Sequence, residues 1–276
     1  MILFRVIKNR NCLLLIFDVK SSQMKTALLQ APLLWENPIA NRRYFEGKIN
    51  ATNENIDLIV LPEMFTSGFT MNPKAVTETM QGETLLWLQA LAKAKNSAIT
   101  GSLVIQENGK FYNRLVFVFP SGEVKTYDKK HLFTLAGEDK TYTSGTEKII
   151  IEYKGFKICP LICYDLRFPV FARNTEDYDV LIYVANWPKP RINAWDALLK
   201  ARAIENMCYT IGVNRIGTDQ NHHDYSGRSQ AIDFLGNYLI EPQETEGVFI
   251  TNLDKNALLE TRQKFGFLND RDEFKM

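Results

Sequence analysis

The sequence predicts an α/β fold with two sheets at its centre and helices on the outside. Short apolar runs typical of strands alternate along the chain with longer segments of helical pattern. The strands are too many for one open sheet flanked by about six helices. No Pro-, Gly- or Ser-rich linker divides the chain into separate domains. A single domain that stacks two sheets accounts for all of these observations.

The predicted elements follow one another from residue 24 onward, which places residues 24–276 in one domain. The strands are mostly apolar runs bounded by turn-forming residues. They cover residues 25–30, 56–61, 98–106, 114–119, 123–128, 149–153, 156–163, 180–185, 209–214, 229–232 and 247–252. The helices cover residues 38–53, 83–95, 168–175 and 193–206.

The strand at residues 56–61 ends in a carboxylate. Pro62 closes the strand because proline has no backbone N–H to donate, and Glu63 follows at what becomes the rim of a sheet. Surface glutamates are common, so an ordinary solvated side chain is the alternative interpretation.

The strand at residues 123–128 ends in a basic pair, Lys129 and Lys130. Neighbouring residues of an extended segment point to opposite faces, so only one of these lysines can face a pocket. In a nearly neutral chain, such a pair is most often a solvated edge.

The strand that begins at Phe156 delivers Cys163 into a polar turn, with a helical segment expected from Leu166 onward. A side chain at such a turn is exposed at the rim of a sheet, and the backbone N–H groups that follow it point at whatever the sulfur attacks. The alternative is a buried thiol with no chemistry, the usual fate of a cysteine.

Three strands therefore end in a carboxylate, an ammonium and a thiol, which suit covalent hydrolysis. A thiol with a reference pKa of about 8.5 needs a base at neutral pH, and Glu63 can take its proton. Lys129 and the backbone N–H of Tyr164 can stabilise the oxyanion formed when Cys163 attacks a carbonyl. The intermediate would be a thioester, which the same carboxylate then helps water to hydrolyse.

Three segments resemble the signature segments of the nitrilase superfamily of carbon–nitrogen hydrolases. They are Leu61-Pro62-Glu63-Met64, Tyr127-Asp128-Lys129-Lys130-His131-Leu132 and Ile162-Cys163-Tyr164-Asp165-Leu166-Arg167-Phe168. Further matching segments lie at residues 186–188, 201–206, 212–217 and 225–229. The resemblance implies a four-layer α-β-β-α sandwich and a Glu-Lys-Cys triad, Glu63, Lys129 and Cys163, with neither cofactor nor metal.

The resemblance also assigns individual residues. It selects Lys129 over Lys130, because the family's lysine lies two residues before the histidine of its motif. Glu138 matches a second glutamate that positions the lysine or the substrate, with an ordinary loop carboxylate as the alternative.

Within the superfamily the chain is most similar to the omega-amidases, which hydrolyse the side-chain amide of 2-oxo acids such as 2-oxoglutaramate or 2-oxosuccinamate. Phe69 and Trp187 are candidates for the pocket wall, and Arg191 for the partner of the substrate carboxylate. We expect Arg167 to form a structural salt bridge under the turn.

Other functions stay open at this point. A nitrilase, an N-carbamoyl amino acid hydrolase or a deaminated glutathione amidase would use the same triad, and a scaffold without activity is the non-enzymatic alternative. A papain-like hydrolase would need a histidine base, and only His131 lies near a motif.

Composition favours a soluble enzyme of small molecules. The formal net charge of +1 over 276 residues gives no reason to expect a nucleic-acid or membrane partner. The four cysteines, Cys12, Cys159, Cys163 and Cys208, show no CxxC pair, which disfavours a zinc cage or disulfide framework. A reduced cytoplasmic location fits a catalytic thiol. The family implies a homodimer, to which the tail at residues 265–271 could contribute.

Residues 1–23 fall outside this pattern. Their apolar stretch, 13–17, is too short for a secretory signal or a membrane span. We interpret residues 1–23 as an upstream extension that precedes the fold, which would begin at Met24.

Overall fold

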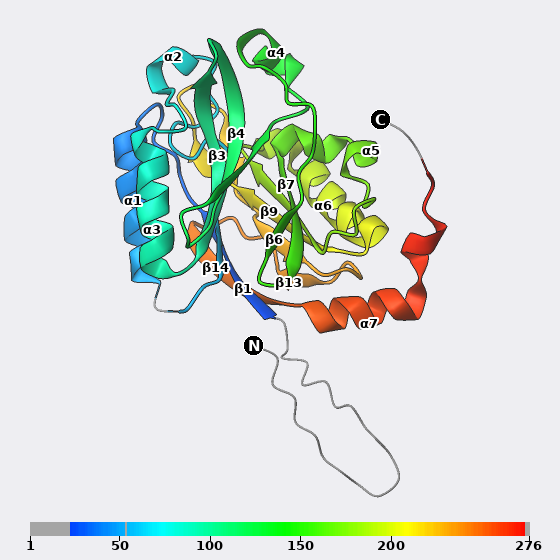
Figure 1. Cartoon of the computed structure of the whole chain (residues 1–276). Coiled ribbons are helices and arrows are strands. Elements are labelled where there is room, and N and C mark those ends of the chain that lie inside the picture. The colour runs from blue at the N-terminus through cyan, green and yellow to red at the C-terminus, as the bar shows by residue number, and fades with distance from the viewer. Residues whose placement is uncertain (1–22, 53, 274–276) are drawn as a thin grey trace, which may run out of the picture.

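The structure, a computed structural model, describes residues 23–52 and 54–273, and it contains two six-stranded mixed sheets that face each other. Helices cover the outer face of each sheet (Figure 1). The predicted α/β architecture with four layers, α-β-β-α, is therefore confirmed. The expected extension at residues 1–23 lies outside the described part except for Gln23, the first residue of β1.

The first sheet has the strand order β14-β1-β2-β3-β4-β5. Its strands are β1 (Gln23–Gln30), β2 (Leu58–Val60), β3 (Ala98–Glu107), β4 (Lys110–Val118), β5 (Val124–Asp128) and β14 (Gly247–Asp254). The helices α1 (Pro38–Ala51) and α3 (Glu83–Lys95) pack on its outer face, as Figure 1 shows. A core of aliphatic and aromatic side chains, among them Phe45, Leu88 and Ile99, fills the space between helices and sheet.

The second sheet has the strand order β13-β12-β9-β8-β7-β6. Its strands are β6 (Ile151–Tyr153), β7 (Phe156–Ile162), β8 (Val180–Ala185), β9 (Tyr209–Asn214), β12 (Gln230–Ile232) and β13 (Tyr238–Ile240). The central strands β7, β8 and β9 are parallel, and β8 and β9 are buried along their whole length. Burial on both faces explains why these strands are continuous apolar runs without alternation.

The largest core cluster contains residues of both sheets, such as Leu58 and Phe117 of the first and Ile158 and Leu161 of the second. The helices α5 (Pro169–Ala172) and α6 (Ile192–Asn206) cover the second sheet. Among the residues described, no helix is long and apolar enough to cross a membrane.

Several elements differ from the prediction. The helix expected at residues 168–175 is shortened to α5, and a 3₁₀ turn, η2 (Cys163–Arg167), precedes it. The elements that the sequence did not indicate are α2 (Pro73–Val76), α4 (Glu138–Thr141), α7 (Lys255–Phe265), β10 (Ile216–Thr218), β11 (Asp224–Ser226) and β13. The tail at residues 265–271 contains the end of α7 and a 3₁₀ turn, η4 (Phe267–Asp270). Most of these elements are three or four residues long, which is too short for a periodic pattern.

Candidate active site

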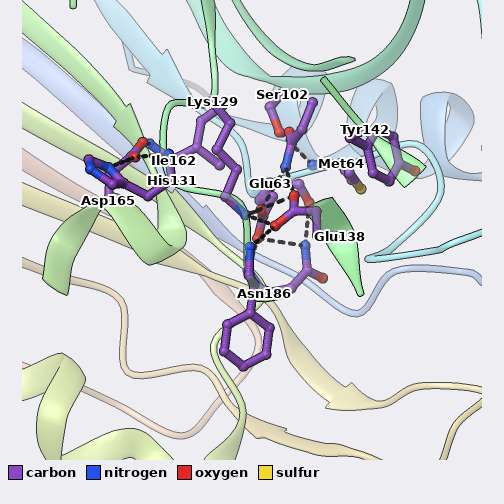
Figure 2. A network of polar contacts seen from close by, with 12 residues as sticks. Glu63, Met64, Ser102, Lys129, His131, Glu138, Tyr142, Ile162, Asp165 and Asn186 are labelled. Carbon is purple, nitrogen blue, oxygen red and sulfur yellow. Dashed lines mark hydrogen bonds and ion pairs between the residues drawn. The ribbon is translucent and has the colours of Figure 1, made fainter. Parts of the chain in front are cut away.

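The structure brings together the residues that end three strands. Glu63 follows β2, Lys129 follows β5, and Cys163 follows β7. The Nζ atom of Lys129 lies 2.9 Å from Oε1 of Glu63, and both side chains are at most 1% exposed (Figure 2). Two charges buried this deeply are stable only when they are paired. Solvent cannot reach the pair, so it does not serve solubility.

Cys163 adopts a left-handed backbone conformation with φ of 45°. Such a conformation is unfavourable for a residue with a side chain, and it is found where a sharp turn must aim a functional group. The residue is half-buried and lines a pocket together with Glu63 and Lys129. The predicted turn, with the sulfur presented at the rim of the sheet, is what the structure shows.

A second carboxylate holds the lysine from the other side. Glu138, the first residue of α4, is fully buried, and its oxygens lie 3.0 and 2.9 Å from Nζ of Lys129. Its Oε2 also accepts the backbone N–H of Phe133 at 2.6 Å. Glu138 is therefore not an ordinary loop carboxylate. Lys130 is half-buried and takes no part in these contacts.

These contacts determine the charges of the site. Burial by itself would lower the pKa of Lys129, but the negative charges of Glu138 and Glu63 outweigh it and raise the pKa, so the ammonium persists. Burial raises the pKa of Glu138, and Lys129 opposes that shift. Burial and the negative charge of Glu63 raise the pKa of Cys163, against the influence of Lys129. The resting thiol is therefore protonated and needs a base in order to react.

Two asparagines complete the surroundings of Glu63. Asn113, in β4, donates from Nδ2 to Oε1 of Glu63 at 2.8 Å and to Oε1 of Glu138 at 3.3 Å. Asn186, just after β8, donates its backbone N–H to Oε2 of Glu63 at 2.8 Å and its side-chain amide to the Glu63 carbonyl at 2.6 Å. Neither residue is among the site residues predicted from the sequence. The position of Asn186 at a strand end was a usable signal, as was a polar residue inside the largely apolar β4.

The turn that carries Cys163 rests on a buried carboxylate, Asp165. This side chain accepts the backbone N–H of Ile162 at 3.0 Å, the hydroxyl of Tyr127 at 2.8 Å and the backbone N–H of His131 at 3.0 Å. The ring of His131 also binds Asp165 (Figure 2). It stacks on the ring of Phe168. His131 does not line the pocket, so nothing supports a papain-like histidine base.

The pocket has a volume of about 570 Å³. The predicted wall residues Phe69 and Trp187 line it, as do Arg191, the predicted partner of the substrate carboxylate, and Tyr164. The ring centre of Phe69 lies 5.3 Å from Nζ of Lys129. Trp187 is buried, and its Nε1 donates to the carbonyl of Arg191 at 2.8 Å. Size and composition suit a small organic substrate.

The structure corrects the expectation for Arg167. Among the residues described, Arg167 forms no ion pair; its guanidinium lies over the ring of Trp187, 5.0 Å from the ring centre, and lines the pocket. The carboxylate under the turn belongs to Asp165, whose oxygens are already occupied by the donors described above. The guanidinium of Arg191 lies in a similar way over Phe133, 5.2 Å from the ring centre. Stacking leaves the N–H groups at the guanidinium edges available to an anion.

Comparison with known proteins decides the family. Residues 23–263 match the family model of the carbon–nitrogen hydrolases. The chain belongs to this family. It is 44% identical over 254 residues to omega-amidase YafV of Escherichia coli strain K12, covering 92% of this chain and 98% of that protein. It is 32% identical to 2-oxoglutaramate amidase of Bacillus subtilis strain 168, over 88% of this chain and 95% of that protein.

A solved structure agrees with both findings. XC1258 from Xanthomonas campestris, described as a CN-hydrolase superfamily protein with an arsenic adduct in its active site, matches with a TM-score of 0.90 and 40% identity. The match covers 92% of this chain and 99% of that one. The resemblance to the nitrilase superfamily and to its omega-amidase branch is confirmed, and with it the assignment of the chain as an amidase.

Proposed function

We propose that this carbon–nitrogen hydrolase cleaves the side-chain amide of a small 2-oxo acid, 2-oxoglutaramate or 2-oxosuccinamate, to the dicarboxylate and ammonia. The observation that carries the proposal is the arrangement of Glu63, Lys129 and Cys163 in one pocket with two guanidinium groups that have no carboxylate partner among the described residues. The names of the relatives support the same substrate class.

The first half-reaction forms a thioester. Glu63 takes the proton of the Cys163 thiol as the sulfur attacks the amide carbon. The oxyanion forms beside the Lys129 ammonium and the backbone N–H of Tyr164. When the tetrahedral intermediate collapses, Glu63 returns the proton to the nitrogen, and ammonia leaves.

The second half-reaction releases the acid. Glu63, again a carboxylate, takes a proton from a water molecule that attacks the thioester carbon. Collapse of this intermediate breaks the carbon–sulfur bond, and the proton on Glu63 passes to the Cys163 thiolate. Glu138 keeps Lys129 in place through both steps and does not itself need to gain or lose a proton.

The substrate carboxylate would bind to the part of the pocket wall at η3 (Lys189–Arg191). Arg191, and with it Arg167, presents guanidinium N–H groups to the pocket, and such groups bind a carboxylate in a planar, two-pronged geometry. Phe69 and Trp187 would enclose the carbon chain between this wall and Cys163.

An ammonia-release assay over a panel of substrates tests the proposal. Release should be much faster from 2-oxoglutaramate or 2-oxosuccinamate than from glutamine or asparagine, because the two guanidinium groups repel an α-ammonium. Simple nitriles should not react. Faster turnover of nitriles, N-carbamoyl amino acids or glutathione-derived amides would reject the 2-oxo acid assignment and keep the triad. Absence of turnover with every amide and nitrile in the panel would support the alternative of a scaffold without activity.

We also propose a cytoplasmic homodimer. The described cysteines, Cys159, Cys163 and Cys208, are free thiols, which suits a reducing compartment. Val170 of α5 and Ile204 of α6 are 57% and 50% exposed, and apolar side chains on an outer helical layer favour pairing. Light scattering coupled to gel filtration measures the mass; a monomer at working concentration would contradict the dimer.

A further inference from the structure

The carboxylates of Glu63 and Glu138 share two hydrogen-bond donors, and only one of the donors is charged. Nζ of Lys129 contacts Oε1 of Glu63 at 2.9 Å and Oε1 of Glu138 at 3.0 Å. Nδ2 of Asn113 reaches the same two oxygens at 2.8 and 3.3 Å. The four groups form a closed ring of alternating donors and acceptors. We propose that Asn113 is a positioning residue that holds Glu63 in the form and orientation of a general base.

The first argument concerns the oxygens of Glu63. A carboxylate oxygen has about two lone-pair sites. Oε1 is occupied by Lys129 and Asn113, whereas Oε2 has one donor at full strength, the backbone N–H of Asn186 at 2.8 Å, and a long contact to the Asn186 side chain at 3.5 Å. Oε2 is therefore the oxygen with capacity for the thiol proton. Asn113 binds the other oxygen, Oε1, and so fixes the orientation of the carboxylate group.

The second argument concerns charge. Two carboxylates and one ammonium leave this buried site with a net negative charge before the thiol reacts. Such a site favours protonation of a carboxylate, which would disable the base. A donor that bonds to the ionised form counteracts this effect, and Asn113 does so without adding a positive charge. A second lysine in its place would neutralise the site and weaken the base.

The third argument concerns rigidity. Asn113 is fully buried in β4, and its backbone carbonyl accepts the N–H of Lys129 at 3.0 Å. One residue thus anchors the lysine through its main chain and both glutamates through its side chain. Its Oδ1 has no partner among the described residues. The side-chain amide thus makes its contacts here through its N–H groups.

The test is the pH dependence of an Asn113→Leu variant. Leu has the same branching as Asn and cannot donate, so it removes the hydrogen bond that favours the ionised form of Glu63. Loss of that bond disfavours the ionised form of the base, so the acidic limb of kcat/KM should move to higher pH by about one to two units. Asn113→Ala removes the same donor with less bulk and gives a shift of the same sign if the Leu variant does not fold.

The inference rests on the proposed triad chemistry but not on the substrate. The rate at which iodoacetamide alkylates Cys163 reports the same proton transfer and needs no substrate, so its acidic limb should shift equally. If 2-oxo acid amides are not hydrolysed but the acidic limb of alkylation shifts, the proposed substrate is wrong and the role of Asn113 stands.

Asn174→Leu is the matched control. Asn174 is fully buried and donates from Nδ2 to two backbone carbonyls, of Tyr178 and Asn206, so its loss should lower the melting temperature and leave the limb in place. A folded Asn113 variant whose limb stays within about 0.3 units of the parent, even with a lower kcat, would overturn the proposal, because a structural role alone lowers the rate at every pH.

Discussion

Arg191 is the residue whose replacement tests substrate recognition most directly. Arg191→Met keeps an apolar stem against Phe133 but removes the guanidinium, which forms no ion pair among the described residues. Hydrogen bonds to charged groups contribute about 1.5 to 3 kcal/mol, and the half-exposed position of Arg191 places this one toward the lower end. We therefore expect kcat/KM for 2-oxoglutaramate to fall about 10- to 30-fold, mainly through a higher KM, because the contact is equally present in ground state and transition state.

The assay compares two substrates. A neutral amide of similar length without a carboxylate should be hydrolysed by Arg191→Met at the parental rate. Arg167→Met should behave in the same way, whereas Lys189→Met, in the same turn but outside the pocket lining, should change neither substrate. An equal loss of activity toward both amides would refute the reasoning, because it would show that Arg191 supports the fold of the pocket and does not bind the carboxylate.

The remaining predictions concern the triad. Cys163→Ala should abolish turnover and leave the melting temperature unchanged. Cys159→Ala, in the core and away from the pocket, should remain active. Substantial turnover by Cys163→Ala in the ammonia assay would show that Cys163 is not the nucleophile. Glu63→Gln should form no thioester by intact-mass spectrometry, because an amide cannot accept the thiol proton. Since burial raises the pKa of Cys163, its alkylation in Glu63→Gln should increase only on the alkaline side of neutrality. Normal thioester accumulation in that variant would confine Glu63 to the hydrolysis of the thioester.

The sequence predicted those parts of the site that depend on the ends of strands. Glu63, Lys129 and Cys163 each follow a predicted strand, and strands that end at one edge of a sandwich bring their last residues together. Neighbouring residues of an extended segment point to opposite faces, so only one of the two lysines could face the pocket, and the family motif selected Lys129. The structure shows Lys129 between two carboxylates.

What the sequence did not indicate depends on contacts between distant segments. Asn113 reaches Glu63 only because β4 pairs with β3 in a particular register, and no local pattern encodes that pairing. The stacking of Arg167 on Trp187 was missed because Trp187 follows a different strand, far from Arg167 in the sequence. The helix α7 has a mostly polar surface and one buried residue, Leu258, so it lacked the apolar stripe that marks a helix.

The carboxylate of Asp165 has a consequence for how the enzyme acquires activity. It lies in the turn after β7, in the second sheet, yet two of its partners, Tyr127 and His131, belong to β5 of the first sheet and the segment that follows it. The nucleophile and the lysine are thus aligned by a bond that exists only after the two sheets have docked. Neither sheet by itself holds all three triad residues, because Glu63 and Lys129 follow strands of the first sheet and Cys163 follows a strand of the second.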